Sequence, residues 1–381
     1  MLLALKRSAN WKFFALLFCF GSAHAQGVLK QYYWTDGVSV TDEEYAQTLE
    51  DFETRIKPSL AKIDGTLASM TVKSLTPKGL TKQEEKIFRT CQEFYGPILA
   101  KRQLTIRLVY GYYDSFLADG TSLTLDESDL GLLADSFTTP CASANSFACG
   151  FRKTKIRGLA AYFFRIPIHL VRDVVGPNGQ TIRVRLELIH SSATPSDRFN
   201  RSELDFNRPG TEQELQSKAA ESTFYSGFRE SDVLIYEGHA REGGGPSFAP
   251  PILKTDISGP VKEPIDFAYY KRAKPGFTKM IEAMTASEHA PRLLAMFACK
   301  SAVYFVDAIH SSPFSSRFSQ ALQKGHTGFL GTSGLTDSSA DYGNTLGLID
   351  SLVAMRCGAK FKSTVSIRIP GSRTVFEGEL P

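Results

Sequence analysis

The sequence carries no large excess of charge of one sign. It has 44 Lys and Arg residues against 40 Asp and Glu residues, for a net charge of +4. Three of the basic residues lie in residues 1–25, which hold no acid, so the rest of the chain carries +1. Binding to nucleic acid depends on neutralising many phosphates, and a near-neutral chain offers no basis for it. We therefore expect no nucleic-acid partner.

The chain also lacks long apolar runs. Beyond residue 25, no stretch approaches the ~18 uninterrupted apolar residues of a membrane-spanning helix. Internal repeats and low-complexity linkers are missing too. Hydrophobic residues nevertheless make up 42% of the sequence and charged residues 22%, which is typical of a folded chain. We expect no integral membrane segment after removal of the N-terminal leader, while the oligomeric state stays open.

Common site signatures are missing as well. The sequence contains no HExxH, no GxxxxGKS or GxxxxGKT, no EF-hand loop and no GxSxG. It has no CxxC pair, so neither a thioredoxin-type site nor a paired-cysteine zinc site is indicated. We predict no metal and no cofactor.

The N-terminus does have the order of a secretory signal. Three basic residues precede the apolar run FFALLFCF, and small residues stand third and first before Gln26. This pattern predicts a signal peptide over 1–25 with cleavage after Ala25. We therefore expect an exported protein, periplasmic or extracellular.

Export changes the interpretation of the cysteines. Five of the six follow the predicted signal peptide: Cys91, Cys141, Cys149, Cys299 and Cys357. Cysteines form disulfides in an oxidising compartment, and an odd number leaves at least one over. Cys141 and Cys149 lie in CASANSFAC, where a short loop closes easily. We expect two disulfides, or one disulfide and buried thiols, and one remaining cysteine.

Hydrophobic patterns predict an alternation of helices and strands. The predicted helices cover 42–63, 81–102, 210–228, 277–285, 311–324 and 342–355, and the predicted strands cover 103–113, 160–175, 181–190, 231–236, 292–298 and 327–331. Wholly apolar strands that alternate with helices favour an α/β fold, with a mostly parallel sheet and helices on both faces. A change of pattern near residue 155 separates a smaller mixed N-terminal region, 26–155, from an α/β domain, 156–381.

Two of the predicted strands end in reactive side chains. SDVLIY runs into Glu-Gly-His, which ends at His239, and RLLAMFA runs directly into Cys299. Ligands of open parallel sheets bind beyond the carboxyl ends of the strands, so neighbouring strands would bring these side chains together. A cysteine nucleophile needs a base within reach, because the thiolate is its reactive form. The pattern predicts a catalytic dyad of His239 and Cys299.

These segments resemble a known superfamily. LIYEGHAREGGG followed by LLAMFACKS is similar to the caspase/gingipain-like cysteine peptidases, and GHTGFLGTSGLT resembles the strand and loop after their nucleophile. The resemblance covers residues 180–355 and implies a caspase-like fold in a secreted bacterial branch. It implies hydrolysis of peptide bonds in a peptide or protein substrate, with His239 as base and Cys299 as nucleophile.

The resemblance also implies an oxyanion hole. Its donors would be the backbone N–H groups of Cys299 and Ala240. The family usually has glycine where this chain has Ala240, so the N–H serves only if the backbone angles suit a residue with a Cβ. Gly238, Gly243 and Gly244 are predicted to let a loop approach the substrate, with a flexible surface loop as the alternative for the glycine run.

Three further possibilities remain open. His190, which ends a predicted strand, is either a pocket residue or a satisfied strand-end histidine. The chain as a whole is either an enzyme or a catalytically inactive caspase-fold protein with a binding or cell-envelope role. A different hydrolase, in which His239 activates Ser301, is a third interpretation.

Overall fold

A computed structural model describes most of the chain from residue 82 onward. The described residues are 82–116, 122–141, 147–154, 167–177, 179–254, 265–287, 289–306, 313–336, 338–365, 372–378 and 380–381. The predicted signal peptide, 1–25, and the predicted helix 42–63 lie outside them.

Helices and strands alternate through most of this part of the chain. In order they are α4 (Lys82–Lys101), β1 (Gln103–Tyr110), β2 (Asp114–Phe116), β3 (Ser122–Thr124), α5 (Asp126–Thr138), β4 (Arg152–Lys153), β5 (Ile168–Val175), β6 (Thr181–Ile189), α6 (Thr211–Glu230), β7 (Val233–Glu237), the 3₁₀ turn η4 (Arg241–Gly243), α7 (Phe267–Ala273), α8 (Pro275–Ala286), β8 (Leu293–Phe297), α9 (Ser301–Phe305), α10 (Pro313–Gly325), β9 (Gly328–Thr332), α11 (Ser338–Val353), α12 (Gly358–Thr364) and β10 (Thr374–Glu377).

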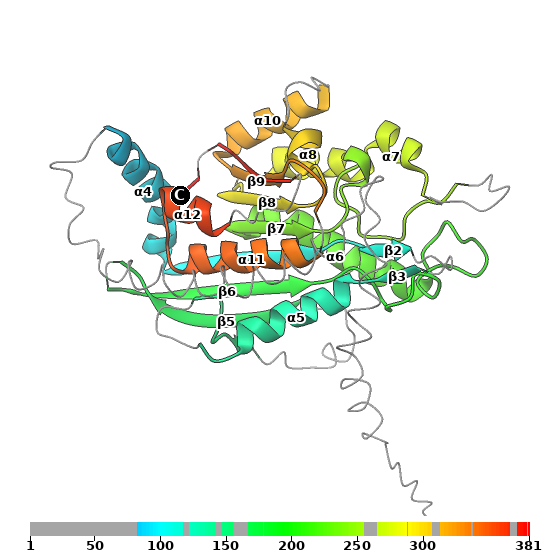
Figure 1. The fold of residues 1–381 in the computed structure, drawn as a ribbon, viewed down its shortest axis with the longest axis horizontal. Coiled ribbons are helices and arrows are strands. Elements are labelled where there is room, and N and C mark those ends of the chain that lie inside the picture. Colours follow the sequence, from blue (N-terminus) through cyan, green and yellow to red (C-terminus); the bar gives the residue numbers. More distant parts are fainter. Residues whose placement is uncertain are drawn as a thin grey trace, which may run out of the picture.

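Most of the strands form one sheet, in the order β10-β9-β8-β7-β1-β6-β5-β4 (Figure 1). The central pairs, from β9 across to β6, are parallel. Antiparallel pairs complete both edges, with β10 on β9 and with β5 and β4 beyond β6. A tight turn joins β5 to β6, in which the Gly176 N–H donates to the carbonyl of Gln180. The prediction of a mostly parallel α/β sheet is confirmed.

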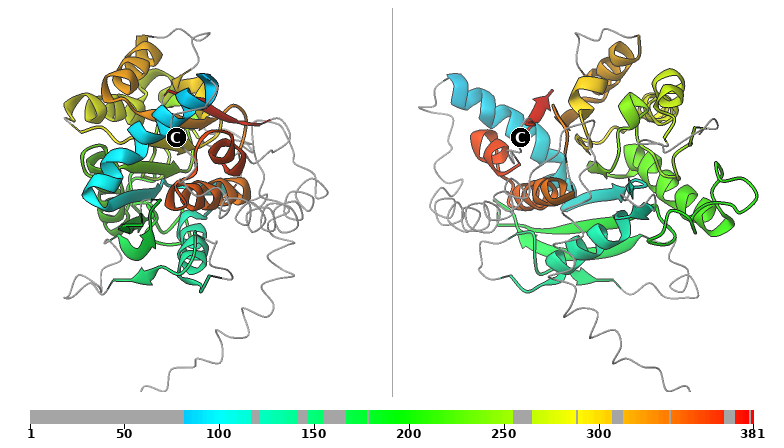
Figure 2. Two further views of the ribbon diagram at one scale, coloured as in Figure 1. Left: turned by 90° about the vertical axis from the view of Figure 1, so that its left-hand side faces the viewer. Right: turned by 45° about the vertical axis from the view of Figure 1, so that its right-hand side comes forward.

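Helices cover both faces of the sheet (Figure 2). One core contains side chains from α4, α5, α11 and α12 against one face, and a second contains side chains from α6, α8, α9 and α10 against the other. β7, β8 and β9 are buried at every position, because each lies between two layers of helices. This explains why these strands are apolar throughout rather than alternating.

β1 lies at the centre of the sheet, between β7 and β6. It belongs to the region predicted as 26–155, whereas both of its neighbours belong to 156–381. The predicted boundary near 155 falls between β4 and β5, which pair with each other. The described part of 26–155 therefore contributes strands to the same sheet as the α/β domain. The change of sequence pattern near 155 marks the edge of that sheet.

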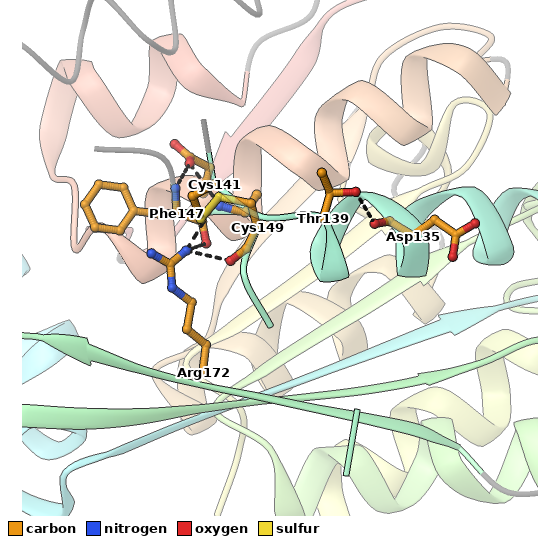
Figure 3. The surroundings of a disulfide bond; sticks show 8 residues. Asp135, Thr139, Cys141, Phe147, Cys149 and Arg172 are labelled. Atoms are coloured by element: carbon orange, nitrogen blue, oxygen red, sulfur yellow. Dashed lines mark hydrogen bonds between the residues drawn. A yellow bond between two sulfur atoms is a disulfide. The ribbon is translucent and has the colours of Figure 1, made fainter. Parts of the chain in front are cut away.

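Two disulfides form as the cysteine count suggested. Cys141 pairs with Cys149, and the guanidinium of Arg172 donates to the carbonyls of Phe147 and Cys149 beside the bond (Figure 3). Cys91 of α4 pairs with Cys357, the residue before α12, across a separation of 266 residues. Cys299 lies outside both disulfides.

Replacing both Cys91 and Cys357 with serine is expected to lower the free energy of unfolding by about 2–5 kcal/mol, because the bond closes a long loop in the unfolded chain. The matched control replaces Cys141 and Cys149, whose separation is 8 residues. By loop length alone, the control loses about 3 kcal/mol less. Denaturant unfolding of both variants tests this, and equal losses would contradict the loop-closure account.

Candidate active site at the carboxyl edge of the sheet

The parallel pairing of β7 and β8 brings the two segments that carry the predicted catalytic residues to one edge of the sheet. Their register pairs Glu237 with Phe297, and the Gly238 N–H donates to the Phe297 carbonyl at 3.3 Å. His239 comes two residues after the last paired residue of β7, and Cys299 comes two residues after the last paired residue of β8, so both lie just beyond the same edge of the sheet. Adjacent strands lie about 4.8 Å apart. The expectation that these two strands are neighbours and end at one edge is therefore met.

His239 is held from the side of β1. Its Nε2 lies 2.9 Å from the carbonyl oxygen of Asp114, and its ring packs edge-on against Tyr113 with centroids 4.8 Å apart. A carbonyl oxygen only accepts hydrogen bonds, so Nε2 carries the proton. In the neutral imidazole the lone pair is consequently on Nδ1, and this nitrogen is the basic atom.

Burial and the nearby Arg241 guanidinium lower the pKa of His239 to about 4, and Asp114 opposes that shift only in part. The imidazole is therefore neutral at pH 7. The side chain still keeps 28% of its surface exposed, so its ring is within reach of solvent. Its nitrogen is therefore able to accept a proton, although a pKa of about 4 makes it a weak base at pH 7.

Cys299 sits at the turn from β8 to α9. Its Sγ lies 3.4 Å from the backbone nitrogen of Thr336, which donates to it, and 3.5 Å from the Thr336 carbonyl. Lys300 follows with a left-handed backbone, φ 53°, and its N–H donates to the carbonyl of Gly334. Left-handed non-glycine residues are uncommon and occur often at functional turns. The turn places the partly buried thiol just beyond the end of β8.

The backbone angles of Ala240 suit a residue with a Cβ, as its place in the predicted oxyanion hole requires. Its backbone angles are φ −82° and ψ −7°, which any residue with a Cβ adopts without strain. Its carbonyl accepts from Gly243 and Gly245, whereas its N–H makes no hydrogen bond to the residues that the structure describes. Ala240 thus keeps a backbone N–H that the predicted oxyanion hole can use.

A buried ion pair between Arg241 and Asp114, which the sequence did not indicate, lies next to His239. Arg241 and Asp114 are 2% and 1% exposed, and their side chains are joined by hydrogen bonds. Arg241 also donates to the carbonyl of Tyr112 at 3.3 Å. Burial alone would raise the pKa of Asp114, but Arg241 and His239 outweigh it and keep the pKa below its ordinary value. The pair fixes the position of Asp114, whose backbone carbonyl accepts the hydrogen bond from Nε2 of His239.

The glycine-rich turn after His239 is packed rather than open. Gly243 and Gly244 are buried, and a Cβ on either would approach a tyrosine ring, Tyr304 or Tyr270. Gly245 has φ +95°, and a Cβ there would lie 2.1 Å from the backbone nitrogen of Phe277. Close packing therefore accounts for these glycines. Contact of Gly238, Gly243 and Gly244 with a substrate stays a prediction.

His190 follows β6 on the same edge of the sheet, but β1 separates β6 from β7. Burial lowers the pKa of His190, and Glu127 opposes the shift. Its Nδ1 has no hydrogen-bond partner among the described residues. Its predicted place in the pocket is thus two strands away from His239, and its role stays a prediction.

Ser301 is not placed to act as a nucleophile. It is fully buried, donates to the carbonyl of Met296 at 2.6 Å and accepts from the Thr332 N–H at 2.9 Å. These bonds tie α9 to β8 and β9. The interpretation in which His239 activates Ser301 therefore loses its support.

Glu237, the last residue of β7, has a pH-sensitive role in stability. Burial raises the pKa of its carboxyl group to about 7, and a hydrogen bond from Thr345 offsets part of that shift. The folded protein then binds a proton more tightly than the unfolded chain between about pH 4.5 and pH 7. The contribution of Glu237 to stability falls as the pH rises through that window, by on the order of 3 kcal/mol.

Replacing Glu237 with Gln is expected to remove this pH dependence. The stability of Glu237→Gln minus that of the parent chain should be larger at pH 8 than at pH 5. Unfolding free energies of both proteins at the two pH values measure this difference. The comparison of the two proteins is needed because His239 has a lowered pKa, so its own contribution to the free energy of unfolding rises with pH while that of Glu237 falls. An equal difference between the two proteins at both values would show that Glu237 titrates normally.

Two features are absent from the part of the chain that the structure describes. No group of three or more His, Cys, Asp or Glu side chains within them is arranged to hold a metal ion. None of the helices described has both the length and the apolar character needed to cross a bilayer.

No model of a known protein family matches the chain, and no curated protein matches it either.

Proposed function

We propose that the chain is an exported cysteine peptidase-like hydrolase with a dyad of His239 and Cys299. The observation that supports this proposal is the parallel pairing of β7 and β8, because His239 and Cys299 each follow the carboxyl end of one of these adjacent strands. The hydrogen bond from His239 to Asp114 adds to it, because it leaves Nδ1 as the basic nitrogen. The two disulfides suit an oxidising compartment and support export.

The proposed reaction has two halves. Nδ1 of His239 takes the thiol proton, Sγ of Cys299 attacks the scissile carbonyl, and backbone N–H groups of Cys299 and Ala240 stabilise the oxyanion. His239 then gives the proton to the leaving amine, and an acyl-enzyme remains. Water, deprotonated by the same nitrogen, releases the acid and restores the thiol.

The contacts of Cys299 favour one alternative. Its sulfur lies against both the N–H and the carbonyl of Thr336 and is partly buried. A catalytically inactive caspase-fold protein with a binding or cell-envelope role would use the cysteine in this way, as a packed side chain. Reactivity of the thiol therefore separates the two functions.

The decisive experiment combines labelling with hydrolysis. The purified chain is treated with a thiol-directed peptidyl probe and, separately, with a mixture of unrelated peptides at pH 7. The proposal expects the label on Cys299, located by mass spectrometry, and new peptide ends. Absence of both label and cleavage would favour the inactive protein.

A further inference from the structure

The face of the sheet at β5 and β6, away from the candidate active site, carries a hollow lined by basic side chains. Its volume is about 590 Å³. The titratable side chains among its lining residues are Arg152, Lys153, His169, Arg183, Arg185 and Glu187. The register explains the gathering, because His169, Val171 and Asp173 of β5 pair with Glu187, Arg185 and Arg183 of β6 and so share one face.

The nearby carboxylates are already engaged. Glu187 lies 2.6 Å from Arg107 and 3.7 Å from His169. Asp173 lies 3.0 Å from Arg183 and 3.9 Å from Arg152. These pairs show that the basic groups of this face bind carboxylates. The carboxylates are fewer than the arginine and lysine side chains, so the face keeps a net positive charge.

The charge of Arg185 is not neutralised by either of these carboxylates. Its side chain is exposed and forms no hydrogen bond or ion pair with the residues that the structure describes. It lies beside Val171 of β5, which in turn pairs with Arg152 of β4, so Arg185 and Arg152 stand in one row across the sheet. Arg152 and Arg183 are 75% and 55% exposed. Arg183 donates to Asp173 through Nε and one Nη2 hydrogen, so the edge formed by Nη1 and Nη2 is the part of its guanidinium that a partner reaches.

The spacing of the arginines matches an extended chain. Arg183 and Arg185 are two residues apart on one strand, so their side chains leave the same face about 7 Å apart. Alternate residues of an extended peptide have the same separation. The hollow has no Phe, Tyr or Trp in its lining, so it lacks the stacking surface that binds nucleic-acid bases.

We propose that this hollow binds an extended acidic polypeptide segment, with Asp or Glu at alternate positions that pair with Arg183 and Arg185. Arginine suits this role because its planar fork binds carboxylates with two hydrogen bonds. The site is separate from the candidate active site, which lies beyond the ends of β7 and β8. It therefore does not depend on the proposed hydrolysis.

The test measures binding of fluorescent peptides to the full chain with Cys299→Ala, so that hydrolysis cannot remove the probe. The probe is an eight-residue peptide of alternating Glu and Thr. We expect Arg185→Glu to weaken its binding by about tenfold or more, with a fall in affinity as salt rises. The matched control is Arg208→Glu, which reverses the charge of an exposed arginine outside the hollow.

Each result bears on the proposal. A peptide of the same charge with paired Glu and paired Thr should bind more weakly, because its carboxylates lose the two-residue spacing. Equal weakening by Arg185→Glu and Arg208→Glu would overturn the site in favour of nonspecific attraction. Binding of pyrophosphate without binding of the Glu-Thr peptide would overturn it in favour of a small-anion site. Arg185→Gln, with an unchanged melting temperature, guards against misfolding.

Discussion

Replacing Cys299 with Ala is expected to lower kcat/KM for peptide hydrolysis by a factor on the order of 10³ or more, because the variant lacks the attacking sulfur. Labelling by a thiol-directed probe should disappear with it. The other four cysteines of the described chain are held in disulfides and do not replace it. Hydrolysis of a fluorogenic peptide, with the folded fraction followed by circular dichroism, measures the effect.

Ser301→Ala is the matched control for this experiment. Ser301 lies two residues from Cys299 but is fully buried and bonded to Met296 and Thr332. Its loss should cost stability, while the folded fraction keeps its activity. Turnover that survives in Cys299→Ala and is lost in Ser301→Ala would assign the chemistry to the serine and refute the proposed dyad.

Replacing Arg241 with Met is expected to lower the free energy of unfolding by about 3–5 kcal/mol. The substitution leaves the carboxylate of Asp114 buried without its partner, and an uncompensated buried charge is far more costly than a missing surface pair. The same change removes one of the two causes that lower the pKa of His239, so that pKa should rise above about 4. Urea unfolding and NMR titration of the imidazole measure the two effects.

The double variant Arg241→Met with Asp114→Asn tests the explanation. It should recover part of the lost stability, because the neutral amide no longer needs a cation. If the double variant loses more stability than the two single variants lose together, the broken ion pair is not the cause of the instability of Arg241→Met.

The elements that the sequence predicted best are the buried ones. β7, β8 and β9 are apolar at nearly every position, and this pattern exists only where helices cover both faces. α5 was missed because its residues DESDLGLLADSFT show little periodicity. Tertiary contacts stabilise its start, where the buried carboxylate of Asp126 accepts from the backbone of Ser191 and Ser192. Such long-range bonds leave no local sequence signal.

The candidate site was predictable only in part. Cys299 and His239 were identified because they come at once, or after two residues, at the end of an apolar strand, whereas Asp114 was not, although it directly follows the predicted strand 103–113. Its contribution is chiefly a backbone carbonyl, which every residue has, so its identity gave no sign of the hydrogen bond to His239. Arg241 lies two residues after His239, but the sequence does not tell that its partner is a residue 127 positions earlier.

The central place of β1 governs how the chain can be assembled. Its two neighbours, β6 and β7, both follow it in the sequence, and its register joins Gln103 to Arg183 and Ile106 to Val233. β1 can therefore pair only after residues much further along the chain are in place, and pairing between residues that are distant in sequence slows folding. A fragment without β1 would expose two unpaired strand edges in the middle of the sheet, which favour aggregation. Shortening the protein from its N-terminus therefore has a limit set by Gln103.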